Sequence, residues 1–298
     1  MTKILNMGSI NIDYVYSVPH FVTAGETLAA TSRQIFPGGK GMNQSIALAR
    51  AGANVTHAGA IGIDGEYLLP VLQEAGVNTD LISILDVPSG HTVIQVNEHG
   101  ENCILLFPGA NRHLDEAFVD RALSPFSTGD ILMLQNEVSC VAYAIKAAAA
   151  RGMKIAFNPS PFDAEISKYP LNLIDFWLLN EIEGQALVND GGENTPNQIL
   201  TALGEKYPKT TLVLTLGMDG VLCRHRGKTY SHSSYKVQVV DTTAAGDTFS
   251  GYFISSIAKG HGIVEALQLA SKAAAISVSR QGAAVSIPSL EEVAGASI

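Results

Sequence analysis

The residues with the clearest chemical implication lie near the C-terminal end, in the string Asp241-Thr242-Thr243-Ala244-Ala245-Gly246-Asp247-Thr248-Phe249. Small residues at 244–246 let a bound group approach the backbone, and the apolar, helix-periodic residues 250–258 follow. The first N–H groups of such a helix have no partner within it, so they form an anion hole suited to a transferring phosphoryl group. Residues 244–246 are therefore candidates for the catalytic backbone.

Asp247 lies at the rim of this predicted anion hole, where a carboxylate can orient a hydroxyl and accept its proton. The helix N-terminus favours the ionised carboxylate, which makes it a weak base. Phosphoryl transfer through a loose transition state depends mainly on positioning and charge neutralisation, so a weak base is sufficient. A lone Gly-Asp pair would more simply be a helix cap, and the surrounding string favours the catalytic interpretation.

A second glycine-rich string precedes a predicted helix at residues 43–51 and reads Pro37-Gly38-Gly39-Lys40-Gly41-Met42-Asn43-Gln44. Its glycines permit tight turning and close approach of the backbone to a ligand. Lys40 and Asn43 add donors suited to hydroxyl groups, although many such turns are only connections. Gly41 stands where a Walker A loop continues with Lys-Ser/Thr, and no G-x-G-x-x-G follows the first strand. A P-loop and a dinucleotide-binding fingerprint are therefore both excluded.

Short apolar runs alternate with longer helical patterns along most of the chain. The predicted strands are Ile4–Met7, His57–Ile61, Ile131–Leu134, Lys154–Phe157, Phe176–Leu179 and Leu212–Thr215. The predicted helices are Asn43–Ala51, Tyr67–Ala75, Asp115–Ala122, Val141–Arg151, Pro196–Tyr207, Ala245–Ala258 and Ile263–Arg280. This alternation predicts an α/β fold with a mostly parallel central sheet and helices on both of its faces.

Two segments interrupt the alternation. Residues 11–36 lack a clear helical pattern, and within residues 89–107 the runs Thr92–Val96 and Asn102–Phe107 are predicted to form a hairpin around a polar turn. We expect both segments to supply strands of a small sheet that lies over the main body as a lid. No repeat or linker divides the chain, so residues 1–298 are expected to form one domain.

Composition restricts the classes of function. The chain has 298 residues, of which 46% are hydrophobic and 16% charged, as expected for a globular protein with a sizeable core. The net charge is -9 and the Lys and Arg residues are scattered, which argues against a nucleic-acid partner. No run approaches the ~18 apolar residues of a membrane span. The N-terminal apolar run is too short for a signal peptide, and three separated cysteines indicate reduced thiols, so we expect a cytoplasmic protein.

The two glycine-rich strings resemble the two signatures of the ribokinase (PfkB) family of carbohydrate kinases, in the family's order. The resemblance covers nearly the whole chain and includes Gly8–Asp13, Gly25–Thr27, Gly109–Asn111, Asn158-Pro159, Asn180–Glu183 and Thr215–Gly217. It implies a ribokinase-like three-layer fold and an ATP-dependent phosphotransferase with an alcohol group as acceptor. D-ribose is the leading acceptor. Another sugar, a sugar acid, a nucleoside, or a non-catalytic sugar- or nucleotide-binding regulator remain as alternatives, whereas an NAD-dependent oxidoreductase lacks its fingerprint.

The resemblance also implies roles for individual positions. Sugar hydroxyls would be bound by Asn11, Asp13, Gly39, Lys40, Asn43, Glu137 and Asp247. The nucleotide would be bound by Asn180, Glu183, Thr215, Gly217, Gly220, Gly246 and Ser271, with Mg²⁺ held mostly through water near Glu183. A potassium ion would be held, mostly by backbone carbonyls, at Asp241, Thr243, Ser277, Arg280, Gly282 and Ser286. A simpler reading of that last set is an ion pair between Asp241 and Arg280.

Two further expectations concern substrate choice and assembly. Met42 stands where the family commonly has a small residue, so it either narrows the sugar pocket or points into the core. In the predicted lid, Val93, Ile94 and Val96 do not share one face, so both faces of the small sheet need cover. Substrate on one face and a partner lid on the other would satisfy this need, and we expect a homodimer.

Overall fold

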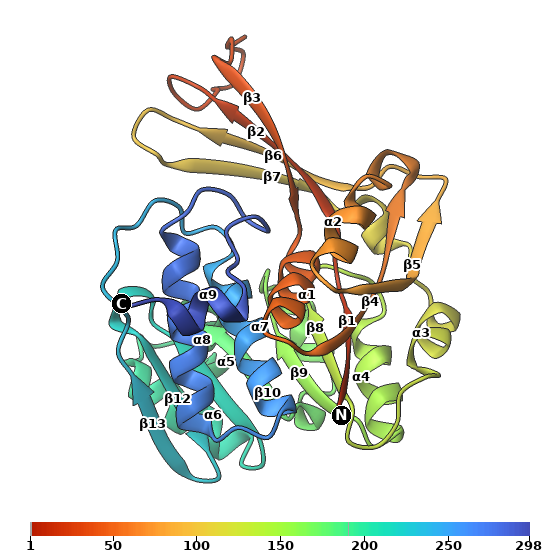
Figure 1. Ribbon diagram of the computed structural model, residues 1–298, viewed down its shortest axis with the longest axis vertical. Helices are drawn as coiled ribbons and strands as arrows, with labels where there is room; N and C mark the ends of the chain where they lie inside the picture. Colours follow the sequence, from red (N-terminus) through yellow and green to blue (C-terminus); the bar gives the residue numbers. More distant parts are fainter. Residues whose placement is uncertain (1, 190) are drawn as a thin grey trace.

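The computed structural model describes residues 2–189 and 191–298, which form a large sheet with helices on both faces and a smaller sheet that projects from it (Figure 1). Within these residues the large sheet has nine strands in the order β13-β12-β11-β10-β9-β8-β1-β4-β5. Their bounds are β1 Lys3–Met7, β4 Asn54–Gly62, β5 Asn78–Leu85, β8 Ile131–Gln135, β9 Lys154–Asn158, β10 Phe176–Asn180, β11 Thr211–Thr215, β12 Val221–His225 and β13 Lys228–His232. In this spatial order, each pair of neighbours from β11 across to β5 is parallel. The pairs β11–β12 and β12–β13 are antiparallel.

The helices bury both faces of the large sheet. Their bounds are α1 Lys40–Arg50, α2 Leu68–Glu74, α3 Glu116–Leu123, α4 Val141–Ala150, α5 Glu181–Val188, α6 Pro196–Lys206, α7 Ala245–Ala258, α8 Ile263–Val278 and α9 Leu290–Gly295. Successive strand residues point to opposite faces, so Ile4 joins the core under α1, α7 and α8, while Leu5 joins the core under α3, α4 and α6. Apolar residues on both strand faces are typical of a covered parallel sheet. The predicted α/β class is confirmed.

The smaller sheet has four strands in the order β3-β2-β6-β7, with bounds β2 Asn11–Ser17, β3 Ser32–Gly38, β6 Gly90–Val96 and β7 Asn102–Phe107. The prediction of a second, small sheet is confirmed. The strand register places Phe36, Asp13, Thr92 and Leu106 in one cross-strand row. The neighbouring row, which contains Leu105, faces the opposite side because side chains alternate along a strand.

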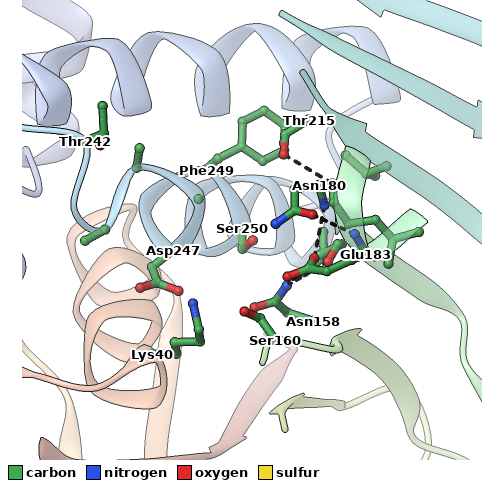
Figure 2. A pocket seen from close by; sticks show the side chains of 16 residues that line it. Lys40, Asn158, Ser160, Asn180, Glu183, Thr215, Thr242, Asp247, Phe249 and Ser250 are labelled. Carbon is green, nitrogen blue, oxygen red and sulfur yellow. Dashed lines mark hydrogen bonds between the residues drawn. The ribbon is translucent and has the colours of Figure 1, made fainter. Parts of the chain in front are cut away.

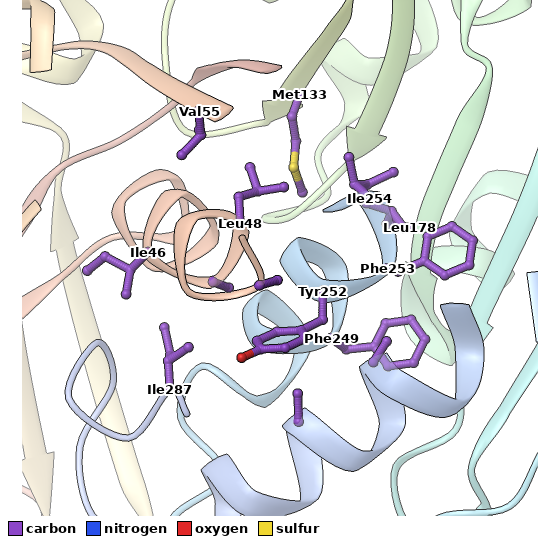
Figure 3. Close-up of a cluster of buried hydrophobic side chains, with 14 of the residues drawn as sticks. Ile46, Leu48, Val55, Met133, Leu178, Phe249, Tyr252, Phe253, Ile254 and Ile287 are labelled. Carbon is purple, nitrogen blue, oxygen red and sulfur yellow. The ribbon is translucent and has the colours of Figure 1, made fainter. Parts of the chain in front are cut away.

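Close packing of α1 against α7 brings the two glycine-rich strings together (Figure 3). A Cβ atom on Gly251 of α7 would lie 2.4 Å from the Cβ of Ala47 on α1, so only glycine allows this approach. Aromatic side chains of α7, including Phe249 and Tyr252, fill the core beside the contact. The first turn of α7 consequently lies next to the first turn of α1.

Helix α1 begins at Lys40, three residues earlier than the sequence pattern predicts. Gly41 is therefore a helical residue rather than part of a turn. A Cβ atom at this position would lie 2.4 Å from the backbone nitrogen of Ser9, so the glycine allows α1 to touch the loop after β1. The pattern also missed β5, β12, β13, α5 and α9.

In the part of the chain that the structure describes, no helix combines the length and the apolar character needed to cross a bilayer.

Candidate active site

Asp247 lies in the first turn of α7 and is buried, with both carboxylate oxygens held by side-chain amides of α1. Asn43 Nδ2 donates to Asp247 Oδ2 at 3.0 Å, and Gln44 Nε2 donates to Oδ1 at 2.9 Å. Two charge-assisted hydrogen bonds from neighbouring residues of one helix fix the position of the carboxylate. The helix contact between α1 and α7 thus has a direct chemical consequence.

The turn that begins α7 is strained and partly open. Ala244 has a φ of 60°, a left-handed conformation that is uncommon for a residue with a Cβ atom and that often marks a functional turn. The N–H of Ala245 donates to the carbonyl of Thr242 at 3.2 Å, so this N–H is engaged within the loop. The N–H groups of Gly246 and Asp247 belong to the first helical turn, which offers them no carbonyl partner inside the helix.

Lys40 brings a positive charge to the same place. Its ammonium group points toward Asp247 across the cavity (Figure 2). Burial lowers the pKa of Lys40, but the carboxylates of Asp247, Glu137 and Glu183 raise it, and the net pKa lies above the usual value. The side chain is therefore a fixed cation surrounded by carboxylates.

Glu137, in the loop after β8, closes the site from the side of the large sheet. Its Oε2 accepts hydrogen bonds from the hydroxyl of Ser9 and, at 3.1 Å, from the backbone N–H of Lys40. Burial raises the pKa of Glu137, and the nearby Lys40 ammonium only partly offsets this effect. The carboxylate is thus positioned beside the start of α1.

The start of β2 supplies two buried polar side chains on the side of the small sheet. Asn11 Oδ1 accepts from Asn111 Nδ2 at 2.8 Å, and Asp13 Oδ1 accepts from the hydroxyl of Thr92 at 2.5 Å. Burial raises the pKa of Asp13, the bond from Thr92 lowers it, and the charge of Asp247 raises it further. A Cβ atom on Gly38 would lie 1.8 Å from Asp13 Oδ2, so the glycine makes room for this carboxylate.

A cavity of about 230 Å³ lies between Asp247 and the carboxyl ends of β10 and β11 (Figure 2). Glu183 lines it from α5, where it forms a capping box with Asn180: Glu183 N donates to Asn180 Oδ1 at 2.8 Å, and Asn180 N donates to Glu183 Oε2 at 3.0 Å. Burial raises the pKa of Glu183, and the hydrogen bond from the Asn180 backbone and the charge of Lys40 lower it in part. One carboxylate facing a polar cavity fits Mg²⁺, which keeps most of its water.

A second, more apolar cavity of about 540 Å³ adjoins the first and shares Gly246 with it. Five of the residues expected on the nucleotide side line this cavity: Thr215, Gly217, Gly220, Gly246 and Ser271. Val237, Val239 and Val278 add apolar walls. An apolar lining with a few polar groups is typical of a small-molecule site.

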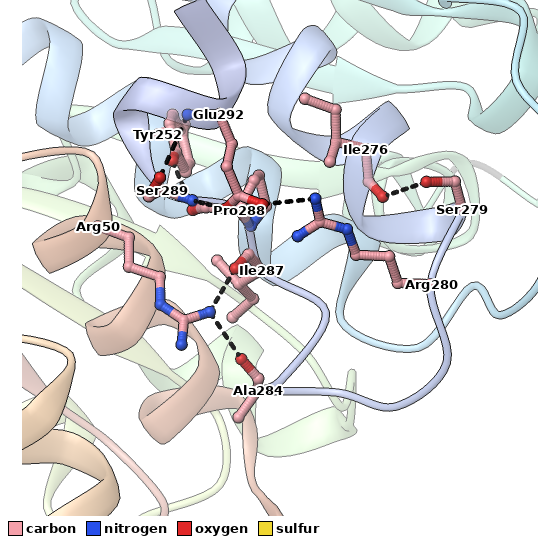
Figure 4. A network of polar contacts seen from close by, with 10 residues as sticks. All are labelled: Arg50, Tyr252, Ile276, Ser279, Arg280, Ala284, Ile287, Pro288, Ser289 and Glu292. Atoms are coloured by element: carbon pink, nitrogen blue, oxygen red, sulfur yellow. Dashed lines mark hydrogen bonds and ion pairs between the residues drawn. The ribbon is translucent and has the colours of Figure 1, made fainter. Parts of the chain in front are cut away.

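The loop before α7 is joined to the segment after α8 through Asp241. Its carboxylate accepts from the backbone N–H of Thr243 and of Gly282, each at 2.9 Å. These hydrogen bonds give Asp241 a lowered pKa, although burial acts in the opposite direction. Arg280 does not pair with Asp241: its guanidinium bonds Glu292 at 2.7 Å (Figure 4). The simpler reading of an Asp241–Arg280 ion pair is therefore wrong.

The segment after α8 is anchored to both helices of the site (Figure 4). Arg50, at the end of α1, donates to the carbonyls of Ala284 and Ile287, and the Tyr252 hydroxyl donates to the carbonyl of Pro288 at 2.7 Å. The hydroxyl of Ser277, in the last turn of α8, and that of Ser286, in the segment after it, bond each other at 2.8 Å. The expected potassium residues thus lie in the loop before α7, in the last turn of α8 and in the segment after α8, which the structure brings together.

Met42 is completely buried among the core side chains around α1, so it does not narrow the expected sugar pocket. This settles the alternative that the sequence left open in favour of the core.

Sequence reasoning missed several side chains that hold the site together. Gln44, Thr92 and Ser9 bond Asp247, Asp13 and Glu137 respectively, yet none was assigned a role. Asn158, at the end of β9, accepts from Gln44 at 3.3 Å. The available signal was position: a polar residue at the carboxyl end of a parallel strand, and a buried polar residue beside Asn43 on the same helix.

The arrangement defines a phosphotransferase: a helix N-terminus and a fixed carboxylate lie at the carboxyl ends of a parallel sheet, beside a cavity that suits a nucleotide. Within the described residues, no cluster of three or more His, Cys, Asp or Glu side chains could hold a metal ion. Residues 1–290 match the family model described as pfkB family carbohydrate kinase. The chain belongs to this family, whose members are phosphotransferases with an alcohol group as acceptor.

Curated and solved relatives agree with this assignment. The chain is 38% identical over 293 residues to a ribokinase of Haemophilus influenzae, a match that covers 96% of this chain and 95% of the relative. A ribokinase of Cryptococcus neoformans, solved in complex with ADP, superimposes with a TM-score of 0.86 at 33% identity and 99% coverage of each chain. A ribokinase of Arabidopsis thaliana, complexed with ribose and ATP, gives a TM-score of 0.86 at 29% identity, covering 98% of this chain and 97% of that one.

Proposed function

We propose that this protein is an ATP-dependent ribokinase, which converts D-ribose and ATP to D-ribose 5-phosphate and ADP. The observation that carries the proposal is the position of Asp247: it lies between a polar region at β2 and α1 and a cavity at Gly246 that suits a nucleotide. The relatives named ribokinase, and the Arabidopsis structure with ribose and ATP, support this choice of substrates.

In the proposed reaction, Asp247 orients the primary hydroxyl of the sugar and accepts its proton. The hydroxyl oxygen then forms a bond to the γ-phosphorus of ATP while the bond between that phosphorus and the bridging oxygen of ADP breaks. The N–H groups of Gly246 and Asp247 stabilise the charge that develops on the transferred group, and Lys40 adds a cation at the same cavity. Positioning and charge neutralisation together account for catalysis.

For the sugar, we propose contacts with Asn11, Asp13, Gly39, Asn43 and Glu137. Asn43 supports this assignment because its amide nitrogen is committed to Asp247, while its buried Oδ1 has no partner among the residues described. A hydroxyl group would supply the missing donor. The buried carboxyl groups of Asp13 and Glu137 likewise suit a polyhydroxylated ligand.

For the nucleotide, we propose that the triphosphate extends from the apolar cavity at Ser271 toward Glu183. Mg²⁺, bound by phosphate oxygens and water, would neutralise phosphate charge near Glu183. A potassium ion held by carbonyls of the two loops at Asp241 and Gly282 would order the turn before α7. Activity that is equal in sodium and potassium at constant ionic strength would refute the potassium site, and activation lost in Asp241→Ala would support it.

We also propose that the small sheet acts as a lid within a single kinase domain, and that two lids pair in a homodimer. We also place the enzyme in the cytoplasm, because its three cysteines are free, as is typical of a reducing compartment.

Release of ADP across a panel of acceptors tests the proposed function. Ribose is expected to give the highest kcat/KM among pentoses, hexoses and nucleosides, because sites that bond hydroxyls discriminate strongly against analogues that lack them. A clear preference for a nucleoside, a ketose or deoxyribose would replace ribose as the substrate and leave the kinase chemistry intact. Absence of phosphoryl transfer to every acceptor would contradict the proposal.

A further inference from the structure

Gln44 connects Asp247 to a continuous polar network inside the protein. The side chain is 0% exposed, and its Nε2 donates to Asp247 Oδ1 at 2.9 Å and to Asn158 Oδ1 at 3.3 Å. Its Oε1 accepts a hydrogen bond from Gln135 Nε2. Both N–H groups of this amide are therefore directed at side chains that line the cavity.

The direction of the Gln44 amide decides whether Asp247 is stabilised or repelled. The oxygen and nitrogen ends of an amide are nearly equal in size, so shape alone does not select one orientation. If the oxygen faced Asp247, two acceptors would lie in contact in a buried place, which costs free energy. The orientation must be set by the groups behind Gln44.

A chain of hydrogen bonds with a defined direction begins at the carbonyl of Gly8, which can only accept. His57 Nε2 lies 3.1 Å from this oxygen and must therefore carry the ring proton. Burial lowers the pKa of His57 to about 4, so the ring is neutral near pH 7 and its Nδ1 is an acceptor. The Ser45 hydroxyl, 2.8 Å from Nδ1, consequently donates to it.

The same logic continues through two amides. Asn6 Nδ2 donates to Ser45 Oγ at 2.8 Å and to the Gly41 carbonyl at 2.7 Å, which leaves Asn6 Oδ1 as the acceptor for Gln135 Nε2 at 2.9 Å. The second N–H of Gln135 donates to Gln44. Because both Asn6 and Gln44 accept from Gln135 Nε2, Gln135 Oε1 points away from them, and it has no partner in the described part of the chain.

We propose that Gln44 is a positioning residue for phosphoryl transfer, held with its donors toward Asp247 by the directed chain from Gly8 through Gln135. Gln44 fixes the carboxylate at the start of α7, and its second hydrogen bond ties that carboxylate to Asn158. Asn158 Nδ2 in turn donates to the Leu178 carbonyl at 2.8 Å and lies 3.5 Å from Glu183 Oε2. The inference rests on the proposed function, in which Asp247 is the base.

Two variants test this role. Gln44→Met keeps similar volume and removes both donors, whereas Gln135→Met leaves Gln44 in place and removes the bond that sets its direction. Each is expected to lower kcat by about tenfold to a hundredfold, the loss that follows from a small misplacement of a reacting group. KM for the sugar, and its dissociation constant from calorimetry, are expected to change by less than about threefold because Gln44 does not contact the sugar.

Ser255→Ala is the matched control for loss of a buried hydrogen bond. Ser255 is buried on α7 and donates to the Ala51 carbonyl at 3.1 Å, at the far end of the helix from Asp247. The melting temperature of Ser255→Ala is expected to fall while its kcat remains that of the wild type.

Wild-type kcat in Gln44→Met and Gln135→Met, with only a lowered melting temperature as in the control, would overturn the inference. If Gln44→Met does not fold, Gln135→Met decides the question alone. The wild type is assayed first with its best acceptor from the panel. A wild type without any phosphoryl transfer overturns the proposed function together with this inference, whereas an active wild type with unaffected variants overturns this inference only.

Discussion

Both oxygens of the Asp247 carboxylate accept hydrogen bonds from α1, and the side chain also lines the cavity, so its chemistry can be separated from its structural role. Asp247→Asn keeps the shape of the side chain and removes the proton acceptor. We expect kcat to fall by about 10²-fold or more, the scale of a positioned acid–base group, while binding of the sugar is largely retained. Steady-state kinetics and calorimetry measure the two effects.

The amides of Asn43 and Gln44 donate to Asp247 and would each face an amide group in the variant, so circular dichroism must accompany the assay. A folded Asp247→Asn enzyme with near-native turnover would show that another group accepts the proton.

Replacing Gly246 by alanine separates an effect on activity from an effect on stability more clearly than the change at Asp247 does. A Cβ atom at this position would meet no protein atom within 4 Å, and its backbone does not require a positive φ. Gly246→Ala should therefore fold as well as the wild type, with a gain in helix propensity of up to about 1 kcal/mol. The added methyl group would occupy the cavity beside the unpaired N–H groups, so we expect kcat to fall by about tenfold or more.

Gly262→Ala is the control, because Gly262 also has open space at its Cβ position but lies away from the cavities, before α8. Thermal unfolding and kcat of both variants are compared. Unchanged kcat in Gly246→Ala would mean that the phosphoryl group does not approach this turn.

At the scale of elements, β4 supports α1 through a buried histidine whose protonation is costly. Burial lowers the pKa of His57 to about 4, so the unfolded chain binds a proton more readily than the folded protein between about pH 6.5 and pH 4. The contribution of neutral His57 to the free energy of unfolding is fully present above about pH 6.5 and is lost as the pH falls from 6.5 toward 4. The loss between pH 7 and pH 5 is about 2 kcal/mol of unfolding free energy.

Raised pKa values of Asp13, Glu137 and Glu183 act in the opposite direction, so the effect of His57 is measured as a difference between proteins. His57→Gln should show less destabilisation on acidification than the wild type, by denaturant unfolding at pH 7 and pH 5. His99→Gln replaces an exposed residue in the turn between β6 and β7, and its stability should depend on pH as that of the wild type does. The same pH dependence in His57→Gln and the wild type would rule out this residue as the cause.

The elements that the sequence predicted best are those with local signals. The parallel strands of the centre are short apolar runs because both of their faces are covered, and α7 follows directly from the string at 241–249. The edge strand β5 was missed because its exposed face carries polar residues such as Asn78 and Asp80. The start of α1 was missed because Gly41 reads as a turn residue until the backbone of Ser9 is seen against it.

The same distinction applies to the site. The position of Asp247 in the first turn of a helix could be predicted because its neighbours in sequence form the turn that begins α7. Gln44 could not, because its partner Asp247 is 203 positions away and the two meet only through the contact of α1 with α7. A buried amide carries no local signal of what it bonds, so its role emerges only when the fold brings several elements together.

At the scale of the whole molecule, the two faces of the small sheet differ: one faces the site, and the other carries exposed apolar side chains. Asp13 and Leu106 share the row that faces the site, and the alternate row joins Ile35, Tyr14, Val93 and Leu105 on the other face. Leu105 is 70% exposed and Ile35 is also exposed. We therefore expect this exposed apolar row to be an association surface.

Pairing of two such sheets in a homodimer would cover this row, and Leu105→Glu tests it. A carboxylate in an apolar contact is costly to desolvate, so by light scattering at micromolar concentration we expect a dimeric wild type and a monomeric variant. Val264→Glu, which places the same charge at a residue 60% exposed on α8, should leave the dimer intact. If the lid is ordered by pairing, Leu105→Glu should also raise the KM for the sugar, because Asp13 lies on the opposite face of the same sheet. A monomeric wild type, or a variant that remains a dimer, would show that the exposed row has another role.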